Sequence, residues 1–110
     1  MKPRIYISGA IEHHNLQQRM YAFDHAARFL SLMGLDPVNP FENGVSQEAA
    51  WSEHMRVDIV NLLGCDYIYM LKGGELSQGA KLELDVATSC GIRVLFEGDK
   101  MENEAVWNRE

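Results

Sequence analysis

The carboxylates of Glu83 and Asp58 are the side chains of this sequence that could form a reactive pair. Glu83 follows Ser77 by six residues, in a stretch where a helix is expected to begin near Gly79. A carboxylate in the first turns of a helix is stabilised in its ionised form by the helix dipole. Such a group can attack an anomeric carbon, and glycosidic reactions use a second carboxylate to position groups or to move a proton. By spacing alone, an ordinary solvent-exposed helix carboxylate explains either residue equally well.

Small polar residues accompany these carboxylates at the ends of predicted strands. Because the carboxyl ends of parallel strands meet at one edge of a sheet, these residues are expected to converge there. Gly9 would let the backbone approach a ligand closely. Ser77 is either a helix cap or a contact to a phosphate or ribose. The expected site consists of Glu83 and Asp58 as catalytic residues, with Tyr6, Ser8, Gly9, Asn39, Ser77 and Gly79 as substrate-binding residues.

Other reactive side chains form no motif of a metal or cofactor site. His54 lies one helical turn from Asp58, and the favoured interpretation is a surface or half-buried histidine rather than a catalytic one. His13 and His14 are adjacent, and no cysteine or third histidine stands at ligand spacing. The sequence contains no GxxxxGK[ST] loop, no GxGxxG after the first strand and no GxSxG elbow. We therefore expect no metal, no cofactor and no serine nucleophile.

Length and charge narrow the class of protein. A chain of 110 residues is expected to form a single domain over 1–110. Its net charge of −6 argues against a nucleic-acid or anionic-membrane surface, because both require a basic face. No apolar run approaches the roughly 20 residues of a membrane span. Cys65 and Cys90 form no CxxC pair and are interpreted as reduced thiols of a cytoplasmic protein.

The pattern of apolar residues predicts alternating strands and helices. Proline cannot donate to a central ladder, so the second strand, with its prolines, is expected at an edge of the sheet. Short links between alternating elements favour a parallel sheet with helices on both faces, in strand order 2-1-3-4. A short docked helix is expected within 98–110. The predicted strands are 5–7, 35–40, 66–71 and 92–96, and the predicted helices are 16–33, 51–63 and 79–90. Asn15 is the expected cap of the first helix, whose apolar face begins at Leu16 and Met20, and Ser46 or Ser52 is the expected cap of the second helix. Asn43-Gly44 is a turn signal between the second strand and the second helix.

Several short segments together resemble a known family. They are Ile5-Tyr6-Ile7-Ser8-Gly9-Ala10-Ile11, Asn39-Pro40, Met55-Arg56-Val57-Asp58-Ile59 and Ser77-Gln78-Gly79-Ala80 with Glu83. The chain is similar to the nucleoside 2-deoxyribosyltransferase-like superfamily, and most of all to its short, often phage-borne members of the DUF4406 type. The resemblance implies a flavodoxin-like, three-layer α/β fold with four or five parallel strands.

The resemblance also implies roles for individual residues. Glu83 matches the family's nucleophile, and Asp58 matches its supporting aspartate. Tyr6, Ser8 and Gly9 match residues that line the sugar or phosphate site, and Ser77 matches a phosphate-binding serine of the relatives that hydrolyse nucleotides. The family is generally oligomeric, so the resemblance implies a homodimer or a higher homo-oligomer.

Three functions follow as hypotheses. The leading one is an N-glycosidase that hydrolyses a 2′-deoxynucleoside 5′-monophosphate through a covalent glycosyl-Glu83 intermediate. A close alternative is a nucleoside 2-deoxyribosyltransferase, in which a second base replaces water. An alternative from another class is a nucleotide-binding module without turnover, such as a sensor or a protein of phage–host conflict.

Overall fold

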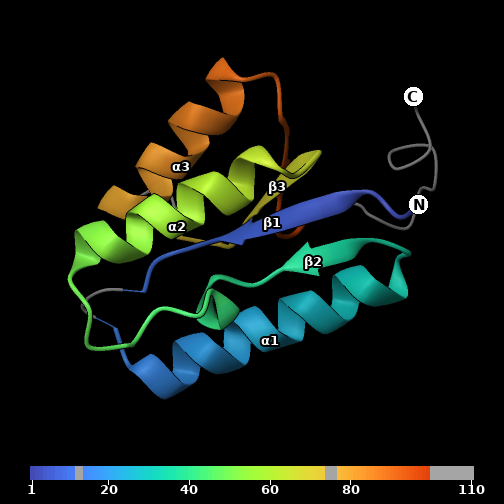
Figure 1. Cartoon of the computed structure of the whole chain (residues 1–110). Helices are drawn as coiled ribbons and strands as arrows, with labels where there is room; N and C mark the ends of the chain where they lie inside the picture. Colours follow the sequence, from blue (N-terminus) through green and yellow to red (C-terminus); the bar gives the residue numbers. More distant parts are fainter. Residues whose placement is uncertain (12–13, 74–76, 100–110) are drawn as a thin grey trace.

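Four parallel strands form the sheet, in the spatial order β2-β1-β3-β4 (Figure 1). The strands are β1 Arg4–Ser8, β2 Asp36–Val38, β3 Tyr67–Met70 and β4 Arg93–Phe96. This order confirms the predicted one. Pro37 lies in β2, at the edge of the sheet, where the missing N–H of proline costs no ladder hydrogen bond.

Helices cover both faces of the sheet, which gives the three-layer α/β architecture expected of a flavodoxin-like fold. Helix α1 lies on one side, and α2 and α3 lie together on the other side (Figure 1). The α-helices are α1 Leu16–Leu32, α2 Trp51–Leu63 and α3 Gln78–Ser89, and a short 3₁₀ helix, η1, spans Pro40–Glu42.

The structure, a computed structural model, describes residues 1–11, 14–73 and 77–99. Most of the tail for which a docked helix was expected lies outside these residues. No helix in the described ranges has the length and apolar character needed to cross a membrane.

The helix ends follow from their capping residues, with one correction. Asn15 caps α1 as expected, because its side chain accepts a hydrogen bond from Gln18 N at 2.9 Å. The start of α2 was expected to be capped by Ser46 or Ser52, and this prediction was wrong. Ala50 occupies the N-cap position, and the Glu53 side chain accepts from Ala50 N at 3.3 Å instead. The Glu53 carboxylate in the first turn thus satisfies the backbone N–H of the N-cap residue itself, and no side chain caps the N–H groups of the first helical residues.

The alternation of side chains along the strands separates two cores. Ile5 and Ile7 of β1 pack with Phe23 and Leu30 of α1. Tyr6 belongs to the opposite core, which contains residues of α2 and α3. Because successive strand residues point to opposite faces, Ser8 lies on the same face as Tyr6. Both hydroxyl side chains are therefore directed toward the layer of α2 and α3.

The amino-terminal end of α1 departs from the predicted pattern. The apolar face that begins at Leu16 and Met20 is buried only from Phe23 onward, since Leu16 is 41% exposed and Met20 is 39% exposed. Phe41 of η1 packs edge-on against Phe23, with 5.1 Å between the ring centroids. The exposed start of α1 and the unexpected 3₁₀ helix therefore lie near the edge of the sheet where the strands end.

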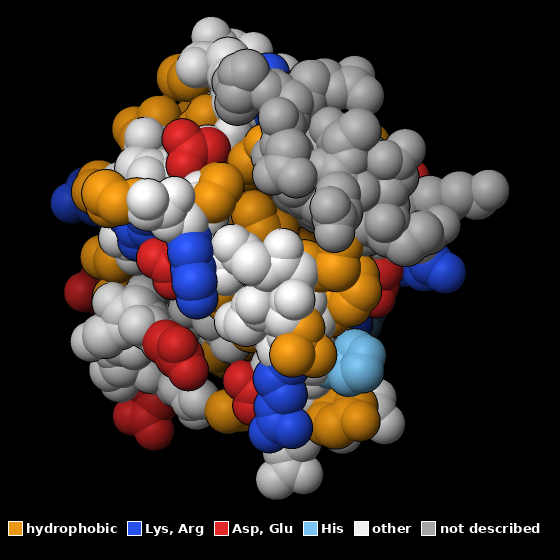
Figure 2. All heavy atoms as spheres, turned by 90° about the vertical axis from the view of Figure 1, so that its right-hand side faces the viewer, with side chains coloured by type: hydrophobic (Ala, Val, Ile, Leu, Met, Phe, Trp, Pro, Cys, Tyr) orange, Lys and Arg blue, Asp and Glu red, His pale blue; other side chains and the backbone are white. Residues whose placement is uncertain are grey.

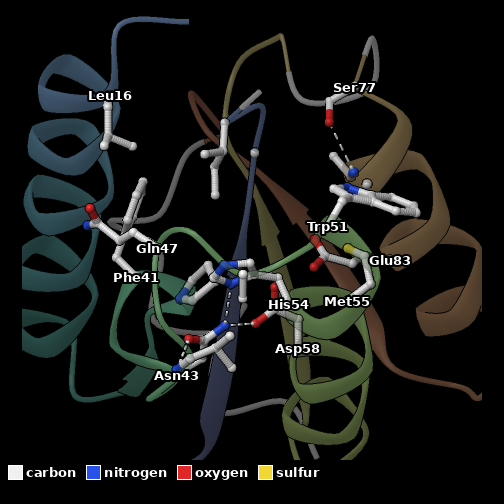
Figure 3. Close-up of a pocket in the computed structure, with 17 residues that line it drawn as sticks. Leu16, Phe41, Asn43, Gln47, Trp51, His54, Met55, Asp58, Ser77 and Glu83 are labelled. Atoms are coloured by element: carbon white, nitrogen blue, oxygen red, sulfur yellow. Dashed lines mark hydrogen bonds between the residues drawn. The ribbon is translucent and has the colours of Figure 1, made fainter. Parts of the chain in front are cut away.

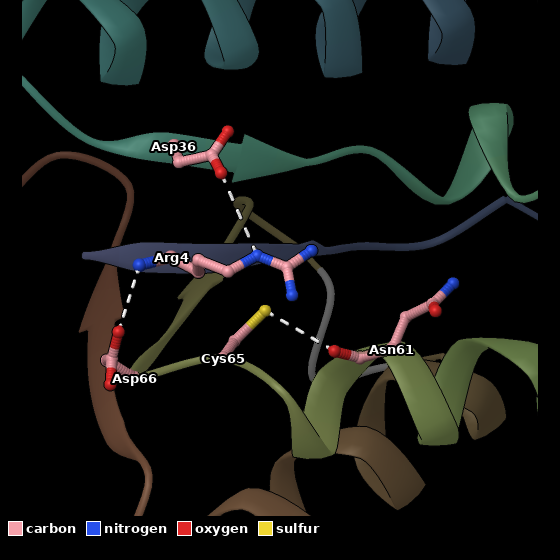
Figure 4. A network of polar contacts seen from close by, with 5 residues as sticks. All are labelled: Arg4, Asp36, Asn61, Cys65 and Asp66. Atoms are coloured by element: carbon pink, nitrogen blue, oxygen red, sulfur yellow. Dashed lines mark hydrogen bonds and ion pairs between the residues drawn. The ribbon is translucent and has the colours of Figure 1, made fainter. Parts of the chain in front are cut away.

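The opposite edge of the sheet, where the strands begin, carries a small set of structural polar contacts (Figure 4). Arg4 N donates to Asp66 Oδ2 at 3.0 Å, which joins the starts of β1 and β3. The ion pair of Arg4 with Asp36 spans 3.8 Å between largely exposed side chains, so it contributes little stability. Burial raises the pKa of the Cys65 thiol to about 11, so this cysteine is a poor nucleophile near neutral pH.

Acidic, basic and apolar side chains are interspersed on the face that Figure 2 shows.

Gly9, which follows β1, provides a test of the packing at the end of the strand. A Cβ at this position would lie 3.1 Å from Leu71 Cβ and 3.2 Å from Phe23 Cζ. We expect Gly9→Ala to lower the free energy of unfolding by about 1–2 kcal/mol, because overpacking outweighs the entropy that alanine removes from the unfolded chain. Urea denaturation measures the change. Gly64→Ala is the matched control, since its Cβ would lie 3.4 Å from Arg4 Nη1 and 3.5 Å from Asn61 O, which are ordinary van der Waals distances. Equal stability of Gly9→Ala and wild type would contradict the prediction.

Candidate active site

A buried carboxylate, that of Glu83 on α3, lies at the centre of the candidate site. Glu83 is 5% exposed. Tyr6 Oη donates a hydrogen bond to its Oε2 at 2.8 Å, and Ser8 Oγ donates to its Oε1 at 2.6 Å. Both donors come from β1 and are fully buried. Each carboxylate oxygen is therefore fixed by a hydroxyl group, and the orientation of the carboxylate is set by β1.

Helix α3 brings Glu83 to this place because of the small residues around it. Ala80 and Ala87 are buried on the same face of the helix, three and four residues from Glu83. Their short side chains allow α3 to pack closely on the sheet. Ser77 caps the helix, and its Oγ accepts a hydrogen bond from Ala80 N at 3.3 Å. The start of α3 thus lies at the edge where the parallel strands end.

Burial raises the pKa of Glu83 to about 7, against hydrogen bonds from Ser8 and Tyr6 that lower it. The nearby charge of Asp58 raises the pKa of Glu83 further. The pKa of Tyr6 lies well above its usual value, first because of burial and then because of the charge of Glu83. Tyr6 therefore keeps its proton and remains a donor, while Glu83 changes its charge near neutral pH.

Asp58 of α2 is the second buried carboxylate and is 6% exposed. Asn43 Nδ2 donates to Asp58 Oδ1 at 2.9 Å and lies 3.3 Å from His54 Nδ1. Burial raises the pKa of Asp58, while the hydrogen bond from Asn43 and, when the ring is protonated, the charge of His54 lower it. Two acids with raised pKa values therefore interact in one site, which is an arrangement typical of acid–base and nucleophilic chemistry.

A cavity of about 250 Å³ opens beside these carboxylates (Figure 3). Its wall combines apolar and aromatic side chains with a few polar groups, as is typical of small-molecule sites. The lining residues are Gly9, Ile11, Leu16, Pro40, Phe41, Asn43, Val45, Gln47, Ala49, Trp51, His54, Met55, Asp58, Ser77, Gly79, Ala80 and Glu83.

The structure brings most of the sequence-predicted site residues together. Five of them line the cavity: Gly9, Asp58, Ser77, Gly79 and Glu83. A Cβ at Gly79 would lie 3.4 Å from Met55 Sδ and 3.6 Å from Trp51 Nε1. Because glycine has no side chain, this part of the wall stays open.

Three other predicted residues occupy different places. Tyr6 and Ser8 are not part of the cavity wall, and their side chains bind Glu83. Asn39 is also outside the lining, and its Oδ1 accepts from Phe41 N at 3.0 Å to cap η1. The expected contact of these three residues with substrate remains a prediction, while the contacts seen here are those of positioning residues.

Sequence reasoning missed several residues of the cavity. Asn43 appeared in the sequence only as half of an Asn-Gly turn signal, and His54 appeared as a surface or half-buried residue. His54 is indeed half-buried, but it lies in the cavity wall. Phe41 and Trp51 bring aromatic surface to the same wall. Because the loop between β2 and α2 has no periodic pattern, only its three-dimensional path reveals these contacts.

The described residues offer no site for a metal ion: no group of three or more histidine, cysteine, aspartate and glutamate side chains is suitably placed among them. The described lining of the cavity also contains no lysine or arginine. A negatively charged ligand would therefore find no cationic lysine or arginine side chain in this described lining, which also holds the carboxylates of Asp58 and Glu83.

Comparisons with known proteins agree with this fold. The model of the DUF4406 family, a domain of unknown function, matches residues 3–96. The chain belongs to the DUF4406 family. No curated protein matches the sequence significantly.

Among solved structures, the chain is similar to the 2-deoxyribosyltransferase of the psychrotolerant bacterium Bacillus psychrosaccharolyticus. The TM-score is 0.67 at 16% sequence identity, over 84% of this chain and 70% of that chain. At this identity, the similarity establishes a common fold. The resemblance to the 2-deoxyribosyltransferase-like fold and to the DUF4406 type is thereby confirmed.

The raised pKa of Glu83 predicts how stability depends on pH. Glu83 has a pKa of about 7 in the folded protein, and its ordinary value of 4.5 applies in the unfolded chain. As the pH rises, Glu83 therefore ionises in the unfolded chain before it ionises in the folded protein. The stability that Glu83 contributes is present below about pH 4.5 and is lost as pH rises through about 7. Gln does not titrate, so we expect Glu83→Gln to gain on the order of 3 kcal/mol relative to wild type between these limits.

Urea denaturation of both proteins at a series of pH values measures this difference. The matched control is Asp85→Asn, because Asp85 lies on the exposed side of the same helix. Its stability relative to wild type should change little over the same range. A constant difference between Glu83→Gln and wild type would show that Glu83 ionises normally.

Proposed function

We propose that this protein hydrolyses the N-glycosidic bond of a 2′-deoxynucleoside 5′-monophosphate, with Glu83 as the nucleophile. The observation that carries the proposal is the Glu83 carboxylate, which lines the cavity while Tyr6 and Ser8 fix both of its oxygens. A buried carboxylate held by donors is oriented for attack on a carbon atom in the cavity. The fold shared with a 2-deoxyribosyltransferase supports the same class of bond as the target.

The reaction proceeds in two balanced steps. A Glu83 oxygen attacks C1′, the C1′–N bond breaks, and the base departs with the bonding electron pair and accepts a proton. Water then attacks C1′, the ester bond to Glu83 breaks, and deoxyribose 5-phosphate is released with the carboxylate restored. Asp58 supplies the first proton and takes one from water in the second step. The raised pKa of Asp58 suits this exchange, and its Oδ2, which no hydrogen bond engages among the described residues, can carry the proton.

The cavity wall suits the parts of such a substrate. Trp51, Phe41 and Met55 offer apolar and aromatic surface on which a nucleobase packs. Ser77 and the first N–H groups of α3 border the cavity, and helix N-termini bind phosphate through such groups. The sugar then lies between the base and the phosphate, beside Glu83.

One observation favours the transferase alternative. The described lining holds the carboxamides of Asn43 and Gln47 but no lysine or arginine. A neutral nucleoside needs a carboxamide for its 5′-hydroxyl and no cation. In that case a second base, rather than water, attacks the deoxyribosyl-Glu83 ester.

A panel of 2′-deoxynucleosides, ribonucleosides and their 5′-monophosphates, assayed for release of free base, tests the proposal. We expect release from a 2′-deoxynucleoside 5′-monophosphate, and a loss of about a thousandfold or more in Glu83→Ala, since the nucleophile is removed. Asp85→Asn is the control on the same helix and should retain activity. Base release by wild type and Glu83→Ala alike would remove Glu83 as the nucleophile.

The same panel separates the alternatives. Ser77→Ala should weaken cleavage of the monophosphate more than cleavage of the nucleoside if Ser77 binds phosphate. Base exchange that outpaces hydrolysis, with nucleosides preferred, would identify a transferase. A binding module without turnover would show nucleotide-dependent thermal stabilisation that survives Glu83→Ala, with no base released.

Tyr6 offers a test through the pH dependence of the reaction. The reaction needs ionised Glu83 to attack and protonated Asp58 to release the base, so kcat/KM should pass through a maximum with pH, and one limb of the profile should report the ionisation of Glu83 near pH 7. Tyr6→Phe removes a hydrogen bond that lowers the pKa of Glu83, so that limb should move about one pH unit higher. Relative to wild type, Tyr6→Phe should therefore lose a larger fraction of its activity at pH 6 than at pH 9.

Tyr69→Phe is the matched control, because Tyr69 is also a buried strand tyrosine but belongs to the core against α1. Its pH profile should coincide with that of wild type. An unmoved profile in Tyr6→Phe would show that the hydroxyl of Tyr6 does not control the ionisation of Glu83.

A further inference from the structure

The amide of Asn43 has only one orientation that satisfies its neighbours. Asn43 Oδ1 accepts a hydrogen bond from Val45 N at 2.9 Å, and Asn43 Nδ2 donates to Asp58 Oδ1 at 2.9 Å. In the reversed amide, two donors would face each other at Val45 and two acceptors would face each other at Asp58. The Nδ2 group is therefore fixed between Asp58 and His54.

This orientation determines the protonation of the His54 ring. Asn43 Nδ2 lies 3.3 Å from His54 Nδ1 and has only hydrogens to offer, so Nδ1 must accept (Figure 3). A neutral imidazole that accepts at one nitrogen carries its hydrogen on the other. His54 thus holds its hydrogen on Nε2.

The Nε2–H of His54 has no partner among the described residues, since the contact with Asn43 is the one hydrogen bond of this ring within them. His54 lines the cavity on the same helix as Trp51 and Met55, whose side chains form its apolar wall. A residue with an unused donor therefore lies in the cavity wall, on the same helix as two of the side chains assigned above to the nucleobase.

We propose that Asn43 is a positioning residue that holds His54 in its Nε2–H form, and that this N–H binds an acceptor atom of the departing nucleobase. The inference rests on the proposed function and adds a contact for the leaving group. As the C1′–N bond breaks, negative charge develops on the ring nitrogens and oxygens of the base. A fixed donor aimed at that charge stabilises the transition state more than the bound substrate. Asn43 thereby contacts both Asp58, the proposed proton donor, and His54, the proposed hydrogen-bond donor to the departing base.

The tautomer is measured directly in the wild-type protein. Two-dimensional ¹H–¹⁵N spectra of protein labelled in its histidine rings, recorded at a pH of about 8 where an ordinary histidine is neutral, distinguish the two forms. His54→Phe identifies the His54 signals by their loss. We expect the Nε2–H form in wild type and a change to the Nδ1–H form in Asn43→Asp, whose carboxylate accepts at that point. The Nδ1–H form in wild type would overturn the proposal.

Kinetics with two leaving groups test the contact with the base. His54→Phe should lower kcat/KM for a nucleobase substrate about tenfold or more, and His54→Gln, which retains an N–H donor, should lose less. With a nitrophenyl 2-deoxyriboside, whose leaving group departs as a stable anion, the loss in His54→Phe should be several-fold smaller. Equal losses for both leaving groups would indicate a purely structural histidine and overturn the proposal.

A separate measurement distinguishes this inference from the proposed function. Free adenine, guanine, cytosine and thymine are titrated into the labelled protein while the Nε2 signal of His54 is followed. A shift with at least one base supports the contact even if no substrate on the panel releases its base, a result that would refute the proposed function alone. No shift with any base would overturn the contact.

Discussion

The hydrogen bonds of Tyr6 and Ser8 to Glu83 are the interaction on which the rest of this structure depends. A buried carboxylate is costly unless donors compensate for the lost water, and β1 supplies one hydroxyl to each oxygen. The donors are two residues apart, so a single strand presents both to the same face. The helix that carries Glu83 must then lie against that face, and small residues of α3 permit the close approach.

A second consequence concerns the ionisation of the site. Each group that holds a carboxylate here is neutral: two hydroxyls at Glu83 and an amide at Asp58. Neutral donors stabilise the charged form less than an arginine or lysine would, so burial prevails and the pKa of both acids is raised. The pKa of Glu83 thereby reaches about 7, so Glu83 changes its charge near neutral pH although neither of its hydrogen-bond donors is charged.

Much of this arrangement could be predicted from the sequence, and the exceptions share a cause. The strand order followed from prolines that exclude β2 from the centre, and the convergence of Asp58 and Glu83 followed from the parallel topology. The side chain of Tyr6 was expected in the cavity wall, yet it is buried behind Glu83. Asn43 carried only a turn signal, because its contacts with residues of α2 depend on the path of an irregular loop. The periodic spacing of apolar residues locates helices and strands. The path of an irregular loop is instead determined by contacts with residues that are distant in the sequence.

The two cysteines differ in a way that has a practical use. Cys65 is buried with a thiol pKa of about 11, whereas Cys90 is exposed at the C-cap of α3. A maleimide dye should therefore attach selectively to Cys90, with no need to engineer a labelling position. Because this cysteine ends the helix that carries Glu83, its fluorescence would report on the environment of that helix while the cavity itself stays unmodified.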